Sequence, residues 1–216
     1  MKEISKRVLS REEVEHIPGS YGDPLRVIQN LPGVARQPFL GGQLVIRGAS
    51  ANDSQVYLDG ETLPSLFHFV GGPSVISEKF IDDVAYYPGG FGVAYGLATA
   101  GVVDIHSRLP EAKQFHGKAS IDLGQAQLYL EIPIGDRTTI QIAGRRSYID
   151  AILPLVLKLA PQRSGTTVTA LTPVYYDYQF RLTHKTLSFG EFSLFIFGSD
   201  DRFKFAQTPS EKNFNF

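Results

Sequence analysis

The sequence predicts two parts with different folds: an α+β domain over residues 21–110 and a run of antiparallel β-strands over residues 111–216. The first part mixes one helical pattern with short strands, without a regular βαβ alternation. The second part repeats apolar and polar residues with a period of two over several segments, which is typical of a sheet with two different faces. Residues 1–20 precede both parts as a charged approach segment.

Composition narrows the class of protein. The chain has 216 residues, a formal net charge of −1 and no cysteine. The charge argues against a nucleic-acid partner held through phosphate contacts, and the absence of cysteine excludes disulfides and thiolate metal sites. The charged N-terminus lacks the apolar run of a signal peptide. The most apolar stretch, 151–160, is about half the length of a membrane-spanning helix. A helical membrane protein is therefore excluded, whereas a β-barrel is not.

The helical pattern of the first part lies within residues 22–34. Asp23 is a candidate N-cap, and Pro24 suits the first helical position. Three apolar residues share one helical face before Pro32 and Gly33 end the pattern, namely Leu25, Ile28 and Leu31.

Short strands and turns follow this helix. Residues 44–60 suggest a strand hairpin that carries Arg47 near its turn, and 71–80 suggests a short helix that opens at Pro73. The strands expected in this part are 43–48, 54–59, 81–87 and 101–107.

The second part alternates more clearly. In 127–134, for example, leucines and isoleucines occupy one face while Gln127, Tyr129 and Glu131 occupy the other. Short turns at 133–138 and 185–190 contrast with a long linker at 150–174 at the opposite end. The strands expected here are 118–123, 127–134, 137–144, 175–184 and 191–200.

The apolar face of these strands has two possible coverings. In a soluble β-sandwich a second layer of the chain covers it, whereas in a barrel lipid covers it and a wet lumen meets the polar face. An open sheet edge in hydrocarbon leaves backbone groups unpaired, so the second case requires closure. The alternation alone leaves both alternatives open.

Several motifs of the first part occur in a characteristic order. They are NLPGV at 30–34, LVIRGASANDSQVYLDG at 44–60 and FIDDVAYYPGGFGVAYGLATAGVVDIHSR at 80–108. Together they resemble the plug domain of TonB-dependent outer-membrane receptors. This resemblance implies an α+β plug domain followed by about five antiparallel strands of an incomplete transmembrane β-barrel, so the chain is expected to be a fragment or an incomplete gene model.

The resemblance also implies a function. Members of the family bind a scarce nutrient, such as a metal chelate, vitamin, sugar or peptide, and import it through the Gram-negative outer membrane. The implied partners are TonB of the inner-membrane energising complex, the nutrient and outer-membrane lipid. No TonB box or signal peptide is identified in the sequence.

The resemblance carries over particular residues. Arg47 would be a latch between plug and barrel, because a guanidinium stays charged and matches carboxylates. The plug glycines are Gly48, Gly60, Gly89, Gly90, Gly92 and Gly96. Three outward tips would contact the cargo, and we expect exposed side chains there at Arg36, Asn52, Phe67, His68 and Phe69. The alternative for Phe67, His68 and Phe69 is packing against the inner barrel wall.

No catalytic or metal-binding pattern stands out. The sequence has no G-x-S-x-G elbow and no H-E-x-x-H, and its histidines lack ligand spacing. We expect no enzyme activity, cofactor or metal. The competing interpretation is a soluble α+β and β-sandwich module that binds glycans or a protein through tyrosines such as Tyr175, Tyr176 and Tyr178.

Overall fold

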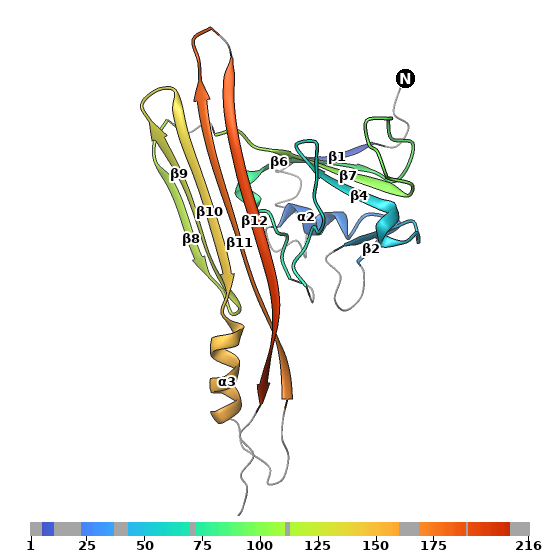
Figure 1. The fold of residues 1–216 in the computed structure, drawn as a ribbon, viewed down its shortest axis with the longest axis vertical. Coiled ribbons are helices and arrows are strands. Elements are labelled where there is room, and N and C mark those ends of the chain that lie inside the picture. Colours follow the sequence, from blue (N-terminus) through green and yellow to red (C-terminus); the bar gives the residue numbers. More distant parts are fainter. Residues whose placement is uncertain are drawn as a thin grey trace, which may run out of the picture.

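The structure is a computed structural model, and it consists of a small N-terminal domain packed against one side of a long antiparallel sheet (Figure 1). It describes residues 6–10, 23–36, 43–69, 72–110, 113–159, 169–188 and 190–207. None of the helices in these described ranges is long and apolar enough to cross a membrane.

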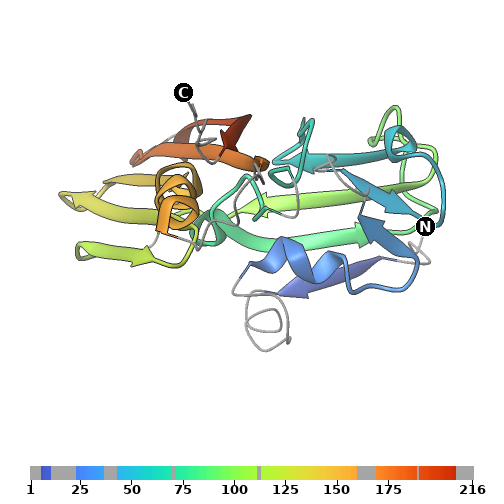
Figure 2. The same cartoon turned by 90° about the horizontal axis from the view of Figure 1, so that it is seen from below.

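The N-terminal domain is built around a five-stranded sheet with the order β1-β6-β7-β4-β5. A second, two-stranded sheet pairs β2 with β3. Figure 2 shows α2 beside the larger sheet. The elements are β1 (Arg7–Ser10), α2 (Pro24–Ile28), β2 (Val34–Arg36), β3 (Leu44–Ile46), β4 (Ser54–Leu58), β5 (Glu61–Thr62), β6 (Ile81–Tyr87), β7 (Gly101–Ser107), and the 3-10 turns η1 (Ala51–Asp53) and η2 (Glu78–Phe80).

Apolar side chains from α2, β3, β6 and β7 form the main core of this domain. Leu25 and Ile28 of α2 are fully buried, as are Ile46, Val84 and Ile105 of the strands. The predicted N-cap is confirmed, because Asp23 Oδ1 accepts a hydrogen bond from Leu25 N at 3.0 Å. Its other oxygen accepts one from Ser74 N at 2.8 Å, so this carboxylate fixes a loop as well as a helix.

Replacing Asp23 with alanine is expected to destabilise the domain by about 1–2 kcal/mol, since the helix loses its cap and Ser74 N loses its acceptor. Urea unfolding of the full-length gene product measures this loss. The matched control is Asp53→Ala, which removes the Asp53 side chain that accepts from Ser50 N in the exposed η1 turn and is expected to cost less. Equal losses in both variants would contradict the double role of Asp23.

The long sheet contains five strands in sequential order, β12-β11-β10-β9-β8, each antiparallel to its neighbours. Tight turns join β9 to β10 and β11 to β12 at one end, and the β10–β11 connection lies at the other end, where it includes helix α3 (Figure 1). The bounds are β8 (His116–Ile121), β9 (Gln125–Ile134), β10 (Thr138–Ser147), α3 (Ile149–Leu159), β11 (Thr169–Lys185) and β12 (Glu191–Gln207).

The two faces of the long sheet have opposite chemistry and opposite surroundings. The polar face lies against the N-terminal domain and is buried, as Gln141, Gln179 and Arg181 show. The apolar face is exposed: Leu194 and Ile196 are 43% and 49% exposed. In the described residues no layer of the chain covers this apolar face. The arrangement is that of a barrel wall which is not closed, and it disagrees with a sandwich, which buries its apolar face.

Three local expectations from the sequence are wrong. Residues 44–60 do not form a hairpin, because β3 pairs with β2 while β4 pairs in parallel with β7. In its described part, 72–80, the segment 71–80 forms the 3-10 turn η2 and no α-helix, because Phe67 and Ser74 form a β-bridge that draws its first half into an extended path. The linker expected at 150–174 is helical up to Leu159 and joins β11 from Thr169.

Candidate functional site

The N-terminal domain and the long sheet meet through buried polar side chains. Arg145, Asp177, Gln179 and Arg181 project from β10 and β11 toward the domain, and each is at most 8% exposed. Burying a polar group costs free energy unless the group has a hydrogen-bond partner. The partners of these side chains therefore show which contacts hold the two parts together.

Arg181 makes the most extensive of these contacts. Its Nη1 donates to the carbonyl oxygen of Arg108 at 2.7 Å, and its Nη2 lies 3.3 Å from Asp59 Oδ2 and also donates to Ser107 Oγ. The guanidinium carbon lies 4.4 Å from the ring centre of Phe195, which adds a cation–π contact. One barrel-wall arginine thus joins the β4–β5 turn and the end of β7 to β11.

Gln179 binds the segment before η2. Its Nε2 donates to the carbonyl oxygen of Val75 at 3.0 Å, and its Oε1 accepts from Ser77 N at 3.2 Å. The same Nε2 lies 3.1 Å from Asp177 Oδ1. The amide therefore holds a loop backbone of the N-terminal domain in register with β11.

His68 lies between two carboxylates of the long sheet. Its Nε2 is 3.0 Å from Asp177 Oδ2 and its Nδ1 is 3.0 Å from Asp201 Oδ1, while its ring stacks on Tyr175 at 4.5 Å. Arg145 Nε also donates to Asp177 Oδ2, at 2.7 Å. Burial lowers the pKa of His68, but the bonds to Asp177 and Asp201 raise it more, so its net pKa lies above the usual 6.5. The imidazolium form, with both nitrogens donating, fits this geometry.

A cavity of about 750 Å³ lies beside this contact, toward the α3 end of the strands. Phe69 lines it and stacks on Phe203 with the ring centres 5.7 Å apart. Charged side chains of both signs line it as well. They include Asp23, Arg26, Lys79, Lys118 and Asp122.

A family model matches the N-terminal part of the chain. The model for the TonB-dependent receptor plug domain matches residues 2–103. The N-terminal domain is a TonB-dependent receptor plug domain. The fold-class prediction is confirmed, since this plug domain is followed by the unclosed antiparallel strands of a partial barrel. Receptors of this family are Gram-negative outer-membrane proteins.

Solved structures share the whole arrangement. A double mutant of the ferric enterobactin receptor PfeA from Pseudomonas aeruginosa matches with a TM-score of 0.61 and 16% identity, over 94% of this chain and 33% of that one. The siderophore receptor PirA from Acinetobacter baumannii matches with a TM-score of 0.61 and 17% identity, over 93% and 32%. This chain therefore spans about a third of the length of these receptors. No curated protein matches the sequence.

The plug domain buries two of the side chains expected to be exposed. Phe67 and His68 are both 0% exposed, so that expectation is wrong for them. The cause is the β-bridge from Phe67 to Ser74, which turns this loop toward β11. Phe69 alone of the three faces the cavity. The alternative of packing on the inner wall describes His68 in this structure, whereas Phe67 is buried in the main hydrophobic core.

The other two expected contact residues lie elsewhere. Asn52 is exposed in η1 and lines a separate cavity of about 310 Å³ with Gln43 and Leu44. Arg36 ends β2, and its side chain lies outside the described residues. The structure thus does not bring Asn52 and Phe69 into one cavity, and the ligand roles of these residues stay predictions.

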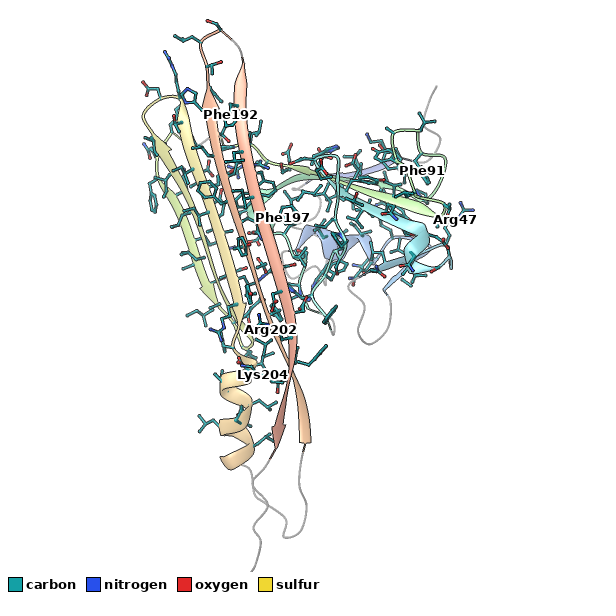
Figure 3. All side chains as sticks on the ribbon, viewed as in Figure 1. Arg47, Phe91, Phe192, Phe197, Arg202 and Lys204 are labelled. Atoms are coloured by element: carbon teal, nitrogen blue, oxygen red, sulfur yellow. The ribbon has the colours of Figure 1, made fainter. Side chains whose placement is uncertain are left out.

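Arg47 lies at the edge of the plug domain that is remote from the long sheet (Figure 3). It has a left-handed backbone with φ of 56°, its side chain is exposed, and its Nη1 donates to the carbonyl oxygen of Pro88 at 3.2 Å. Within the described residues it meets no carboxylate. Its role as a latch to other parts of a barrel stays a prediction.

The plug glycines fall into two groups. Gly48, Gly60 and Gly90 have left-handed φ angles, and a Cβ on Gly89 would lie 2.9 Å from Arg47 Nη1, so each has a local reason to be glycine. At Gly92 and Gly96 the space is open and φ is ordinary, so the structure gives no such reason.

Sequence reasoning missed Asp59, Asp177 and Arg181 as functional residues. Alternation placed Asp177 and Arg181 on the polar face, which is correct, but a polar face alone does not say which residue has a partner. The signal that could have identified Arg181 is a long charged side chain in the middle of the polar face that contacts the plug domain.

Proposed function

We propose that this protein is an outer-membrane receptor that binds a ferric siderophore and imports it with energy transduced by TonB. The observation that carries the proposal is the seating of a plug domain on the polar face of a sheet whose apolar face is exposed. Such a sheet suits a wet, plugged lumen on one side and lipid on the other. A soluble glycan-binding module lacks this reason to expose apolar strands.

The cavity beside Phe69 is the proposed cargo site. It lies between plug and wall at the rim that carries α3, opposite the tight turns, and long connections face the outside in barrels of this kind. Aromatic rings at Phe69 and Tyr175 offer apolar contact, while Arg26, Lys79 and Lys118 offer cations to an anionic chelate.

Relatives support this class of cargo. The structures named above are siderophore receptors, and another PfeA mutant structure contains enterobactin, with a TM-score of 0.55 and 16% identity over 91% of this chain and 33% of that one. TonB is proposed as the partner through the family, with its docking segment expected near the N-terminus.

Replacing Phe69 with alanine is expected to weaken binding of the transported siderophore about tenfold, because the cargo loses an aromatic contact. Binding of a panel of ferric siderophores, including ferric enterobactin, to the full-length gene product measures this, together with iron uptake in cells. The control is Phe91→Ala, an aromatic residue on the far edge of the plug domain (Figure 3).

Two results would contradict the proposal. If the parent protein takes up none of the ferric siderophores, the cargo class is wrong. If Phe69→Ala and Phe91→Ala bind the transported siderophore equally well, the cavity is not the cargo site.

A further inference from the structure

A third cavity lies on the outward face of the long sheet, away from the plug domain. It is a groove of about 800 Å³ near the α3 end of β8 to β12, and we call it the outer groove. Leu128 and Val174 contribute apolar surface to it, and Tyr176 and Tyr178 contribute rings. Nothing in the import mechanism requires it.

The strand register explains why this face is hollow. Gly144 lies opposite Tyr178 on β11, and Tyr178 lies opposite Gly198 on β12. No atom lies within 4 Å of the position that a Cβ would take at Gly144, so the missing side chain leaves open space. At Gly198 the Tyr178 ring occupies that position, within 2.6 Å. The two glycines let one tyrosine tilt aside and leave a depression.

Cations gather at the rim end of the outer groove. Arg146, Arg202 and Lys204 all line it, and Figure 3 shows Arg202 and Lys204 close to α3 on β12. Arg202 pairs with Asp200 at 2.6 Å and Lys204 with Asp150 at 2.8 Å, but neither carboxylate lines the groove.

Arg146 makes no ion pair among the described residues. Arg145 and Asp177 also line the groove, and they pair with each other at 2.7 Å, so the lining of the groove is net positive. The side chains of Arg202 and Lys204 remain 64% and 58% exposed, so they are free to turn toward a second acceptor.

The position of these cations along the strands identifies their surroundings. Farther from the rim, the outward residues are apolar, as at Leu130, Ile142 and Ile196. Tyr178 follows, then Tyr176 with Arg146 opposite it, and Arg202 and Lys204 come last. An apolar band, then tyrosines, then cations is the order expected from the hydrocarbon core through the interface to the head groups of a bilayer.

We propose that the outer groove binds the phosphate of a phosphorylated lipid in the leaflet that surrounds this rim. Guanidinium groups match phosphate oxygens with paired hydrogen bonds, and Lys204 adds a point charge. The acyl chains would lie along Leu128 and the apolar band beyond it, at Leu130 and Ile142. The inference rests on the membrane location of the strands but not on the import of any cargo.

Native mass spectrometry of the full-length gene product tests this with a diphosphorylated lipid A as probe and the same lipid without phosphates as control. The variant Arg146→Gln, which breaks no ion pair, is expected to reduce binding of the phosphorylated lipid about tenfold. The triple variant, which combines Arg146→Gln with Arg202→Gln and Lys204→Gln, is expected to bind the phosphorylated and the unphosphorylated lipid equally well. Lys185→Gln, at the opposite rim, is the matched control and is expected to bind like the parent.

Three outcomes would overturn the proposal. They are unchanged lipid preference in Arg146→Gln, equal binding of both lipids by the parent, and displacement of the lipid by millimolar inorganic phosphate, which would indicate a site for the free ion. Siderophore uptake is expected to be unchanged in Arg146→Gln. Its failure in the parent would reject the proposed cargo and leave the lipid result standing.

Discussion

Replacing Arg181 with alanine is expected to loosen the plug domain from the barrel wall more than any other single substitution. The change leaves the carbonyl oxygen of Arg108 and the Ser107 hydroxyl without their donor, and it removes the cation over Phe195. Truncating one member of a buried hydrogen-bonded charge pair costs about 2–5 kcal/mol. Because Asp59 is partly exposed and regains water, we expect a value in the lower half of that range.

Hydrogen exchange of the full-length gene product measures this effect. Amides at the end of β7 and in the β4–β5 turn are expected to exchange faster in Arg181→Ala, while those within β10 stay protected. Arg181→Lys is expected to recover only part of the protection, since an ammonium lacks the planar fork. Arg137→Ala, in the exposed β9–β10 turn, is the control. Unchanged exchange at β7 in Arg181→Ala would mean that this arginine does not hold the plug domain.

The contact of His68 with the wall is expected to weaken as the solution becomes more alkaline. The folded-state pKa of His68 lies above its unfolded value of about 6.5. The charged ring therefore contributes its full stabilisation below pH 6.5, and this contribution is lost as pH rises through the raised pKa. Deprotonation leaves Asp177 and Asp201 sharing a neutral ring that donates from only one nitrogen.

Protection of the amides of residues 66–69, measured against pH, tests this expectation. In the parent the protection is expected to fall on the alkaline side of pH 6.5, beyond the ordinary change in exchange chemistry seen at control amides in β10. In His68→Gln that extra fall is expected to disappear, because glutamine does not titrate. His184→Gln, which alters an exposed histidine at the tight-turn rim, is expected to keep it. A pH profile that is the same in the parent and in His68→Gln would refute the role of the imidazolium.

The strands of the long sheet were the most predictable part of the fold. Apolar and polar residues alternate along these strands because one face of the sheet is apolar and the other is polar. The alternation continues from strand to strand because neighbouring strands share the same two faces. Strand ends were less predictable: β11 begins at Thr169, before the expected 175, because its pairing with β12 continues past the level of the plug domain. Helix α3 was not predicted, because Pro154 and Lys158 interrupt the apolar run at 151–160 in the sequence.

The interface between plug and wall was far less predictable. Asp59 and Arg181 are 122 residues apart, and local patterns carry no information on such a pairing. Phe67 and His68 belong to no periodic segment, so the sequence suggested an exposed loop. In the structure His68 is buried against two carboxylates far along the chain, Asp177 and Asp201, and Phe67 is buried in the main hydrophobic core. The sequence could indicate that the face was polar but not what would lie against it.

The most direct test concerns the two faces of β12. Since the chain has no cysteine, single cysteines can be introduced at Ser193 and Leu194, which are neighbours on opposite faces, and labelled with a fluorophore. With the full-length gene product in bilayers that contain nitroxide-labelled lipid, the label at Leu194→Cys is expected to be quenched and the label at Ser193→Cys is not. Equal quenching at both positions, or a product that stays soluble without lipid and quenches at neither, would contradict a wall that has lipid on one side and a plug on the other.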